Sequence, residues 1–220
     1  MNNKLVKNSD LFDCQNTYLK ELFVCEYPWE IISKIKSFIK DFVNNIPEGF
    51  TEISEGVYVG KSVKIHKSAV IESPTIICDN TEIRPGAYIR GNVFIGNNCV
   101  IGNSTEIKES ILLDYVQVPH YNYVGNSLLG NHSHMGASSI CSNLKTDGKN
   151  VVIHAETDYE TGLRKIGAIL GDYADIGCGS VLNPGTIIGK KTSVYPLTMV
   201  RGVIPAGMIV KSMNNIVERK

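Results

Sequence analysis

The sequence has no long apolar run, no net charge and no paired-cysteine motif. No stretch approaches the ~18–20 apolar residues of a membrane helix, and the start, Met1-Asn2-Asn3-Lys4, leads into polar sequence rather than a signal-peptide core. The 22 Lys and Arg balance 22 Asp and Glu, which argues against nucleic-acid binding through bulk positive charge. Six cysteines without a Cys-x-x-Cys pair are typical of free thiols, not of a disulfide framework or a zinc knuckle. We therefore predict a soluble, cytoplasmic protein without a membrane or nucleic-acid partner.

The most prominent feature that is present is a six-residue repeat. The chain of 220 residues is 43% hydrophobic, so it can bury a core without disulfides. Aliphatic residues recur at every sixth position over ten consecutive steps: Val59, Ile65, Ile71, Ile77, Ile83, Ile89, Ile95, Ile101, Ile107 and Leu113. A second series starts at Leu170 and a short third one at Leu129. Repeats of this kind indicate a solenoid rather than a globular α/β fold.

The fourth residue after most of these aliphatic positions is small or β-branched, as at Ala69, Thr81 and Ser133. A six-residue unit is long enough for one flat side and one corner, with both residues pointing inward. The pattern resembles the hexapeptide-repeat family, which implies an all-β fold, a single-stranded left-handed parallel β-helix. Three units make one coil in that family, so we expect about six coils over residues 57–212, stacked ~4.8 Å apart.

Two segments interrupt the repeat. Residues 1–50 have helical periodicity, with Pro28 suited to a first turn and an apolar stripe through Ile31, Ile35 and Phe38. We expect this N-terminal segment to pack on the coil or on a neighbouring subunit. Residues 143–165 predict a hairpin-like excursion loop, because long excursions from rigid scaffolds often carry function. Residues 213–220 are expected to be a C-terminal tail.

Several motifs occur in an order that carries a more specific resemblance. They are Arg84-Pro85-Gly86-Ala87, Thr105-Glu106-Ile107-Lys108, His120-x-x-Tyr123-x-Gly125, Asn143, and Lys165 followed by Gly171-Asp172. The segment 83–205 resembles the acetyltransferase domain of the bifunctional glucosamine-1-phosphate acetyltransferases/UDP-N-acetylglucosamine pyrophosphorylases. It also resembles the C-terminal domain of archaeal sugar-1-phosphate nucleotidylyltransferases.

The resemblance implies an acetyl-CoA-dependent N-acetyltransferase acting on an amino-sugar 1-phosphate, with glucosamine-1-phosphate as the expected substrate. His120 then matches the general base and Asn143 a residue at the acyl-transfer centre. The residues that match the sugar-phosphate site are Arg84, Lys108, Tyr123 and Lys165. Ala137 matches the residue whose backbone N–H faces the thioester carbonyl.

Departures from the family pattern concern both ligands. The acceptor-site Asn is His134 here, and a Ser that lines the acetyl-CoA channel is Cys178. The C-terminal Arg that meets coenzyme A has no clear match, and Lys211 is the nearest basic residue. The sequence shows no counterpart of the family's nucleotidylyltransferase domain, so we expect a separate nucleotidylyltransferase as a partner. No metal is expected, because His132-x-His134 has no nearby carboxylate or Cys in the same stretch.

The residue types suit acyl transfer. An imidazole, with an ordinary pKa near 6.5, can accept the proton of an amine that attacks a thioester. In the family the site lies between neighbouring β-helices, which implies a homotrimer, and Tyr88, Phe94 and Val100 are expected to leave apolar faces for it. Two alternatives stay open: a same-fold acyltransferase with another acceptor, and a non-catalytic trimeric partner of a nucleotidylyltransferase. His120 alone is also compatible with a structural bulge at Val118–Gly125.

Overall fold

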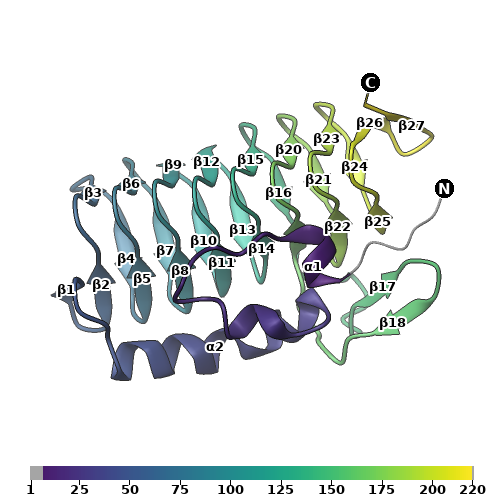
Figure 1. Ribbon diagram of the computed structural model, residues 1–220. Helices are drawn as coiled ribbons and strands as arrows, with labels where there is room; N and C mark the ends of the chain where they lie inside the picture. The colour runs from purple at the N-terminus through teal and green to yellow at the C-terminus, as the bar shows by residue number, and fades with distance from the viewer. Residues whose placement is uncertain (1–6, 220) are drawn as a thin grey trace.

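The computed structural model describes residues 7–219, most of which wind into a left-handed parallel β-helix (Figure 1). The coil has three flat sides, each a sheet built from successive coils. We name them the helix-covered face, the His120 face and the Lys108 face. Within residues 7–219, two α-helices, a short 3-10 helix and a hairpin lie outside the coil.

In spatial order, the helix-covered face consists of β1 (Thr51–Ser54), β2 (Val57–Val59), β5 (Thr75–Ile77), β8 (Val93–Ile95), β11 (Ser110–Leu112), β14 (Leu128–Leu129), β19 (Ala168–Leu170), β22 (Thr186–Ile188) and β25 (Val203–Ile204). The His120 face consists of β3 (Lys64–Ile65), β6 (Glu82–Ile83), β9 (Val100–Asn103), β12 (Gln117–His120), β15 (His134–Met135), β20 (Asp175–Ile176), β23 (Ser193–Val194), β26 (Met208–Ser212) and β27 (Asn215–Glu218). The Lys108 face consists of β4 (Val70–Glu72), β7 (Tyr88–Arg90), β10 (Glu106–Lys108), β13 (Tyr123–Gly125), β16 (Ile140–Cys141), β21 (Val181–Leu182) and β24 (Met199–Val200).

The predicted inward columns form the core of the coil. The aliphatic residues from Ile77 to Ile107 are buried in one cluster with Leu170 and Ile176. The small residues of the second column are buried as well, and Thr81 and Thr105 each donate a side-chain hydrogen bond to a backbone carbonyl of the coil. The corners take left-handed backbone, as at Asn98 (φ 57°), a conformation that Asn tolerates better than most residues.

The repeat shortens by one residue at the corner after Lys108, ahead of the bulge considered at Val118–Gly125. Leu112, not Leu113, points into the coil, and Leu113 packs in the outer cluster under the helix. The corner after Arg90 uses both Gly91 and Asn92, whereas the corner after Lys108 uses only Glu109. The prediction that Leu113, the tenth residue of the series, points inward is therefore wrong. A fixed six-residue step does not allow for a corner that is one residue shorter.

The estimate of about six coils is also too low. The helix-covered face and the His120 face each hold eight parallel strands. At the two ends, β1 pairs antiparallel with β2 and β27 pairs antiparallel with β26. Residues 213–220, expected as a tail, thus include a strand that covers an exposed sheet edge.

The N-terminal segment covers one face of the coil. It contains α1 (Asn8–Leu11), a short 3-10 helix at Leu22–Val24 and α2 (Pro28–Asn44), which runs along the coil in Figure 1. The predicted stripe of α2 packs in one cluster with Ile76, Phe94 and Ile111. Phe94 is fully buried there, so the expectation that it forms an exposed subunit contact is wrong.

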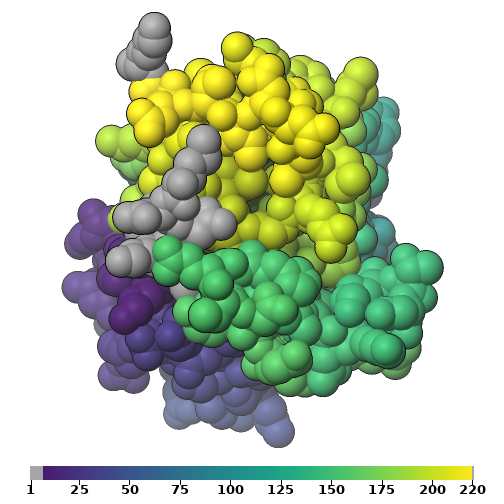
Figure 2. Space-filling model, turned by 90° about the vertical axis from the view of Figure 1, so that its right-hand side faces the viewer, coloured from purple at the N-terminus to yellow at the C-terminus, as the bar shows by residue number. Residues whose placement is uncertain are grey.

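The excursion forms the expected hairpin, β17 (Val152–His154) paired antiparallel with β18 (Asp158–Glu160). It does not project freely. Tyr159 packs against Tyr27 and Trp29, with ring centroids 5.3 Å from each, and Ile153 is buried. Figure 2 shows the excursion in green against the purple N-terminal segment. Together these two segments form one outer layer beside the coil.

Candidate functional site

One group of predicted residues gathers on the Lys108 face, at its edge with the helix-covered face. Lys108 stands on β10 and pairs in register with Gly125 on β13. Asn143 follows β16 one coil further on, and Lys165 returns beside it through a bridge to Leu144. The structure thus brings Lys108, Asn143 and Lys165 to one edge, although they lie far apart in the sequence.

Gly125 makes room for two of these side chains. A Cβ on Gly125 would lie 2.6 Å from the Tyr123 hydroxyl and 2.9 Å from the Asn143 amide nitrogen. Both groups therefore lie directly over the backbone of this glycine. Burial raises the pKa of the Tyr123 phenol, so it remains a neutral hydrogen-bonding group at physiological pH.

The cations of this edge differ in their surroundings. The Lys108 side chain is only 13% exposed, and its ammonium lies 3.7 Å from the Glu109 carboxylate. Arg90 stands one coil before Lys108 on the same face and binds Glu106 at 2.8 Å. Among residues 7–219, neither Arg164 nor Lys165 forms an ion pair.

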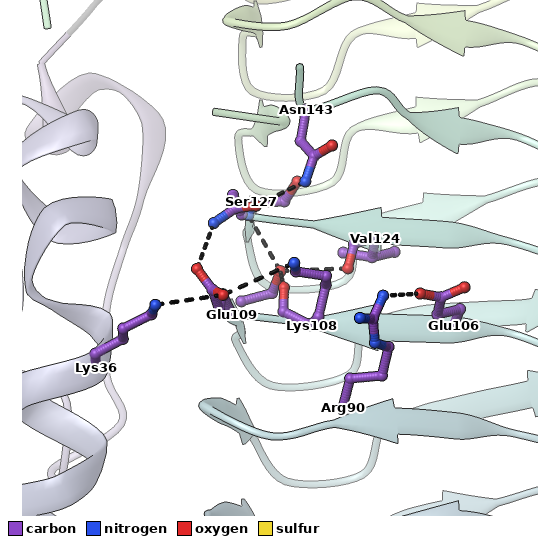
Figure 3. Close-up of polar contacts among 10 residues, drawn as sticks. Lys36, Arg90, Glu106, Lys108, Glu109, Val124, Ser127 and Asn143 are labelled. Carbon is purple, nitrogen blue, oxygen red and sulfur yellow. Dashed lines mark hydrogen bonds and ion pairs between the residues drawn. The ribbon is translucent and has the colours of Figure 1, made fainter. Parts of the chain in front are cut away.

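A cavity of about 320 Å³ opens beside this edge. Its lining comes from three segments: α2 with Ser33 and Lys36, the coil corners with Glu109 and Asn126, and the returning excursion with Arg164 and Lys165. Figure 3 shows how the polar side chains of this region connect α2 to the coil. A basic, partly enclosed cavity of this kind can hold an anionic group.

A second group forms a column on the His120 face. Successive coils place His120, Ala137 and Cys178 in register, because the His120 carbonyl accepts from Ser138 N–H at 3.0 Å and the Ala137 carbonyl accepts from Gly179 N–H at 2.8 Å. The His120 side chain is exposed, and its backbone N–H donates to the Asn122 side chain at 3.1 Å. The corner therefore holds His120 outward on rigid backbone.

His134 lies on the same face and forms a pair that the sequence did not indicate. Its Nδ1 lies 2.8 Å from the Asp175 carboxylate, and this hydrogen bond lowers the Asp175 pKa. A cavity of about 510 Å³ is lined by this pair, by the exposed Cys178 and by Arg219. Arg219 also bonds Ser193 across the end of the coil.

Arg84 and Lys211 do not join the groups to which the resemblance assigned them. Arg84 lies on the His120 face and bonds Glu82 at 3.3 Å, while Lys108 and Tyr123 occupy a different sheet. The arginine in register with Lys108 is Arg90, as the eighteen-residue spacing of one coil predicts. Lys211 is exposed in β26, whereas Arg219 is the basic residue that lines the Cys178 cavity.

A third cavity of about 440 Å³ lies between the excursion and the last coils. It is lined in part by Lys145 and His154 of the excursion and by Ser142, Asn183 and Arg201 of the coil. Sequence reasoning missed Arg201, because only the fold places it near the excursion.

Several cysteines and His132 have surroundings that indicate a structural role. All six cysteines are free, and burial raises the pKa of Cys99 and Cys141 to about 12. The His132 ring stacks between Tyr115 and Tyr173, with centroid distances of 4.5 and 4.7 Å.

Within residues 7–219, no helix combines the length and hydropathy that crossing a membrane takes.

Comparison with known sequences confirms the resemblance. A family model described as the GMPPB C-terminal domain matches residues 71–161. The bifunctional protein GlmU of Methanococcus vannielii is 31% identical over 195 residues, which cover 87% of this chain and 46% of the relative. The bifunctional sugar-1-phosphate nucleotidylyltransferase/acetyltransferase of Sulfurisphaera tokodaii is 31% identical over 107 residues, 48% of this chain and 27% of the relative. The chain thus spans less than half the length of these curated relatives.

Solved structures with a similar β-helix are more distant. A variant of GDP-perosamine N-acetyl transferase from Caulobacter crescentus, in complex with CoA and GDP-perosamine, is 18% identical, covers 72% of this chain and 56% of that chain, and has a TM-score of 0.43. A variant of AntD, an N-acyltransferase from Bacillus cereus, is 19% identical, covers 78% and 91%, and has a TM-score of 0.44.

Proposed function

We propose that this chain transfers the acetyl group of acetyl-CoA to the nitrogen of an amino-sugar 1-phosphate, with glucosamine-1-phosphate as the first acceptor to test. The observation that carries this proposal is the group on the Lys108 face: Lys108 and Lys165 beside Tyr123 and Asn143, all on one edge of a rigid coil. The similarity to relatives named as nucleotidylyltransferase/acetyltransferases supports it.

The phosphate of the acceptor would bind between Lys108, Lys165 and Arg90. A phosphate dianion favours several cations that approach from different sides. Arg90 and Lys108 come from rigid strands, whereas Lys165 comes from the excursion and lines the cavity. Arg84 lies on the His120 face, so it does not belong to the phosphate subsite that we propose on the Lys108 face of the same chain.

The acyl transfer would use the column on the His120 face. The amine nitrogen attacks the thioester carbonyl carbon, a C–N bond forms, the C–S bond breaks and coenzyme A leaves as the thiol. His120 would accept the proton of the amine, and the Ala137 backbone N–H would donate to the oxyanion. Cys178 and Arg219 would lie along the coenzyme A path, because both line the cavity next to this column.

The two groups lie on different sheets, so a complete site would need a second copy of the chain. The Lys108 face of one chain would meet the His120 face of the next, and repetition of this contact closes a ring. We propose a homotrimer on this ground. The helix-covered face would lie outside, because α2 and the excursion occupy it.

A thiol-release assay with acetyl-CoA tests the proposal directly. The panel should contain glucosamine-1-phosphate, its epimers, the free amino sugars and sugar nucleotides. His120→Ala is expected to lower kcat ~10²–10⁴-fold, the usual effect of losing a general base. His66→Ala is the matched control, since His66 is also exposed on the same side of the coil, where its ring bonds only Ser68.

Equal turnover by the His120→Ala and His66→Ala variants would mean that His120 is not the general base. Absence of thiol release with every acceptor would favour the non-catalytic partner of a nucleotidylyltransferase instead. Turnover only with an acceptor that lacks phosphate would mean that the chain is an acyltransferase without the proposed phosphate subsite.

A further inference from the structure

Three corner residues of the Lys108 face form a polar ladder across successive coils. Glu109 and Asn126 occupy equivalent corners with left-handed backbone, at φ 44° and 51°. Asn126 Nδ2 donates to Glu109 Oε2 at 2.8 Å, and Asn143 Nδ2 donates to Asn126 Oδ1 at 2.7 Å. We call this the Glu109–Asn126–Asn143 ladder.

The carboxylate at its base gives the ladder one direction. Glu109 can only accept, so Asn126 must turn its amide nitrogen toward it. The Asn126 oxygen, on the other arm of the amide, accepts from Asn143 Nδ2. The carbonyl oxygen of Asn143 lies on the side away from Asn126 (Figure 3).

Two lysines fix the carboxylate itself. Lys36 of α2 lies 3.5 Å from Glu109 Oε1, and Lys108 lies 3.7 Å from the same oxygen. The other oxygen, Oε2, is the one that Asn126 binds. Figure 3 shows Glu109 between Lys36 of the helix and Lys108 of the coil. Asn126 is 5% exposed, so water competes little for its hydrogen bonds.

We infer that Glu109 is a positioning residue that makes Asn143 present a hydrogen-bond acceptor to the bound substrate. An acceptor there fits an N–H or O–H of the substrate and does not fit a thioester carbonyl, which offers no donor. The inference rests on the proposed function, in which the reacting amine supplies that N–H. It also gives the N-terminal helix a part in the site, through Lys36.

The variant Glu109→Gln tests the direction of the ladder. The introduced glutamine would keep its oxygen on the two lysines and turn its nitrogen to Asn126. Asn126 and then Asn143 would flip, so that Asn143 presents a donor. We expect kcat to fall about tenfold with the KM for acetyl-CoA unchanged, the cost of one misplaced hydrogen bond.

A second substitution should restore the direction. In the double variant Glu109→Gln/Asn126→Asp, the introduced aspartate can accept both from the introduced glutamine and from Asn143. We expect kcat to return to within about twofold of the parent protein, because Asn143 again donates inward. A loss that came only from packing would not be rescued by this exchange. Glu55→Gln, at an exposed turn, is the control for removing one carboxylate.

A readout without catalysis keeps this inference separate from the proposed function. The side-chain amide signals of Asn126 and Asn143 in ¹⁵N NMR spectra should both shift in Glu109→Gln, and that of Asn143 should return in the double variant. Lys36→Met should shift them less, and Lys40→Met, further along the exposed side of α2, not at all. Unchanged Asn143 signals in Glu109→Gln, or a double variant that stays as slow as the single one, would overturn the inference. If no acceptor is acetylated, the proposed function fails while these signals still decide the ladder.

Discussion

At the scale of single residues, the lack of a side chain at Gly125 shapes the group on the Lys108 face. Gly125 is buried beneath Tyr123 and Asn143, and its backbone serves as the floor of the group on the Lys108 face. The hydroxyl and the amide meet there because no Cβ separates them. This makes a conservative substitution informative.

Gly125→Ala should disturb the site more than the fold. The added methyl would lie 2.6 Å from the Tyr123 hydroxyl, so this side chain must move. Overpacking of this kind costs about 1–3 kcal/mol in unfolding free energy. We expect the KM for the acceptor to rise, with coenzyme A binding unchanged in calorimetry. An unchanged KM would mean that Tyr123 does not contact the acceptor.

The His134–Asp175 pair predicts that the stability of the fold depends on pH. The hydrogen bond from His134 lowers the Asp175 pKa, so the pair stabilises the fold above about pH 3.9, the ordinary carboxyl value, and this contribution is lost as the pH falls through the lower folded value. In His134→Asn the Asp175 carboxyl should titrate at a higher pH. Carboxyl ¹³C shifts followed by NMR measure this directly. No change in the Asp175 titration would show that the pair does not persist in solution.

At the scale of elements, α2 and the excursion are bound to the coil by one apolar layer. Ile35 and Ile39 are buried, and Phe42 packs on Phe94 at a centroid distance of 5.8 Å. The helix begins with Pro28 and a capping interaction in which Glu30 accepts from the Tyr27 N–H at 2.8 Å. This packing sets the position of Lys36 against the corner at Glu109.

Ile39→Ala should destabilise the whole protein. Ile39 is fully buried, and its truncation leaves a cavity worth about 2–4 kcal/mol of unfolding free energy. Lys40→Ala, the exposed neighbour, is the matched control and should change stability by less than about 0.5 kcal/mol. Urea titration measures both values. Trp29, the sole tryptophan, reports on α2 by fluorescence, and a fluorescence transition that precedes the circular dichroism transition would mean that α2 separates from the coil.

At the scale of the whole molecule, the two groups of site residues point from different sides of a triangular coil. One coil side separates the column at His120 from the ladder edge at Asn143. An assembly is therefore part of the proposed function and not an accessory to it. Light scattering should find about three chains of 24.2 kDa each.

Mixing two inactive variants tests whether the site is shared. His120→Ala damages only the His120 face, and Asn143→Ala only the Lys108 face. If each site takes one face from each of two chains, co-expression in equal amounts should restore about a quarter of the parent activity, since one junction in four combines two intact faces. Each variant alone should stay inactive at the same protein concentration. Recovery no greater than the sum of the two single variants would place the complete site within one chain.

The sequence by itself determined the coil, because a period of six leaves only a flat side and a corner per repeat. It also determined the start of α2 at Pro28 and the hairpin in the excursion, since these depend on local periodicity and turn residues. It could not locate the one-residue shortening at Glu109, because Leu112 and Leu113 are equally apolar.

Only the tertiary structure decided which chemical groups meet. Contacts across a solenoid depend on the residue count of every coil, so a single short corner or an excursion shifts all later registers. Asp175 reaches His134 across 41 positions for this reason, whereas Arg90 stands beside Lys108 at the regular spacing of eighteen residues. The Glu109–Asn126–Asn143 ladder likewise joins three coils, and Lys36 links it to α2; no local pattern encodes such contacts.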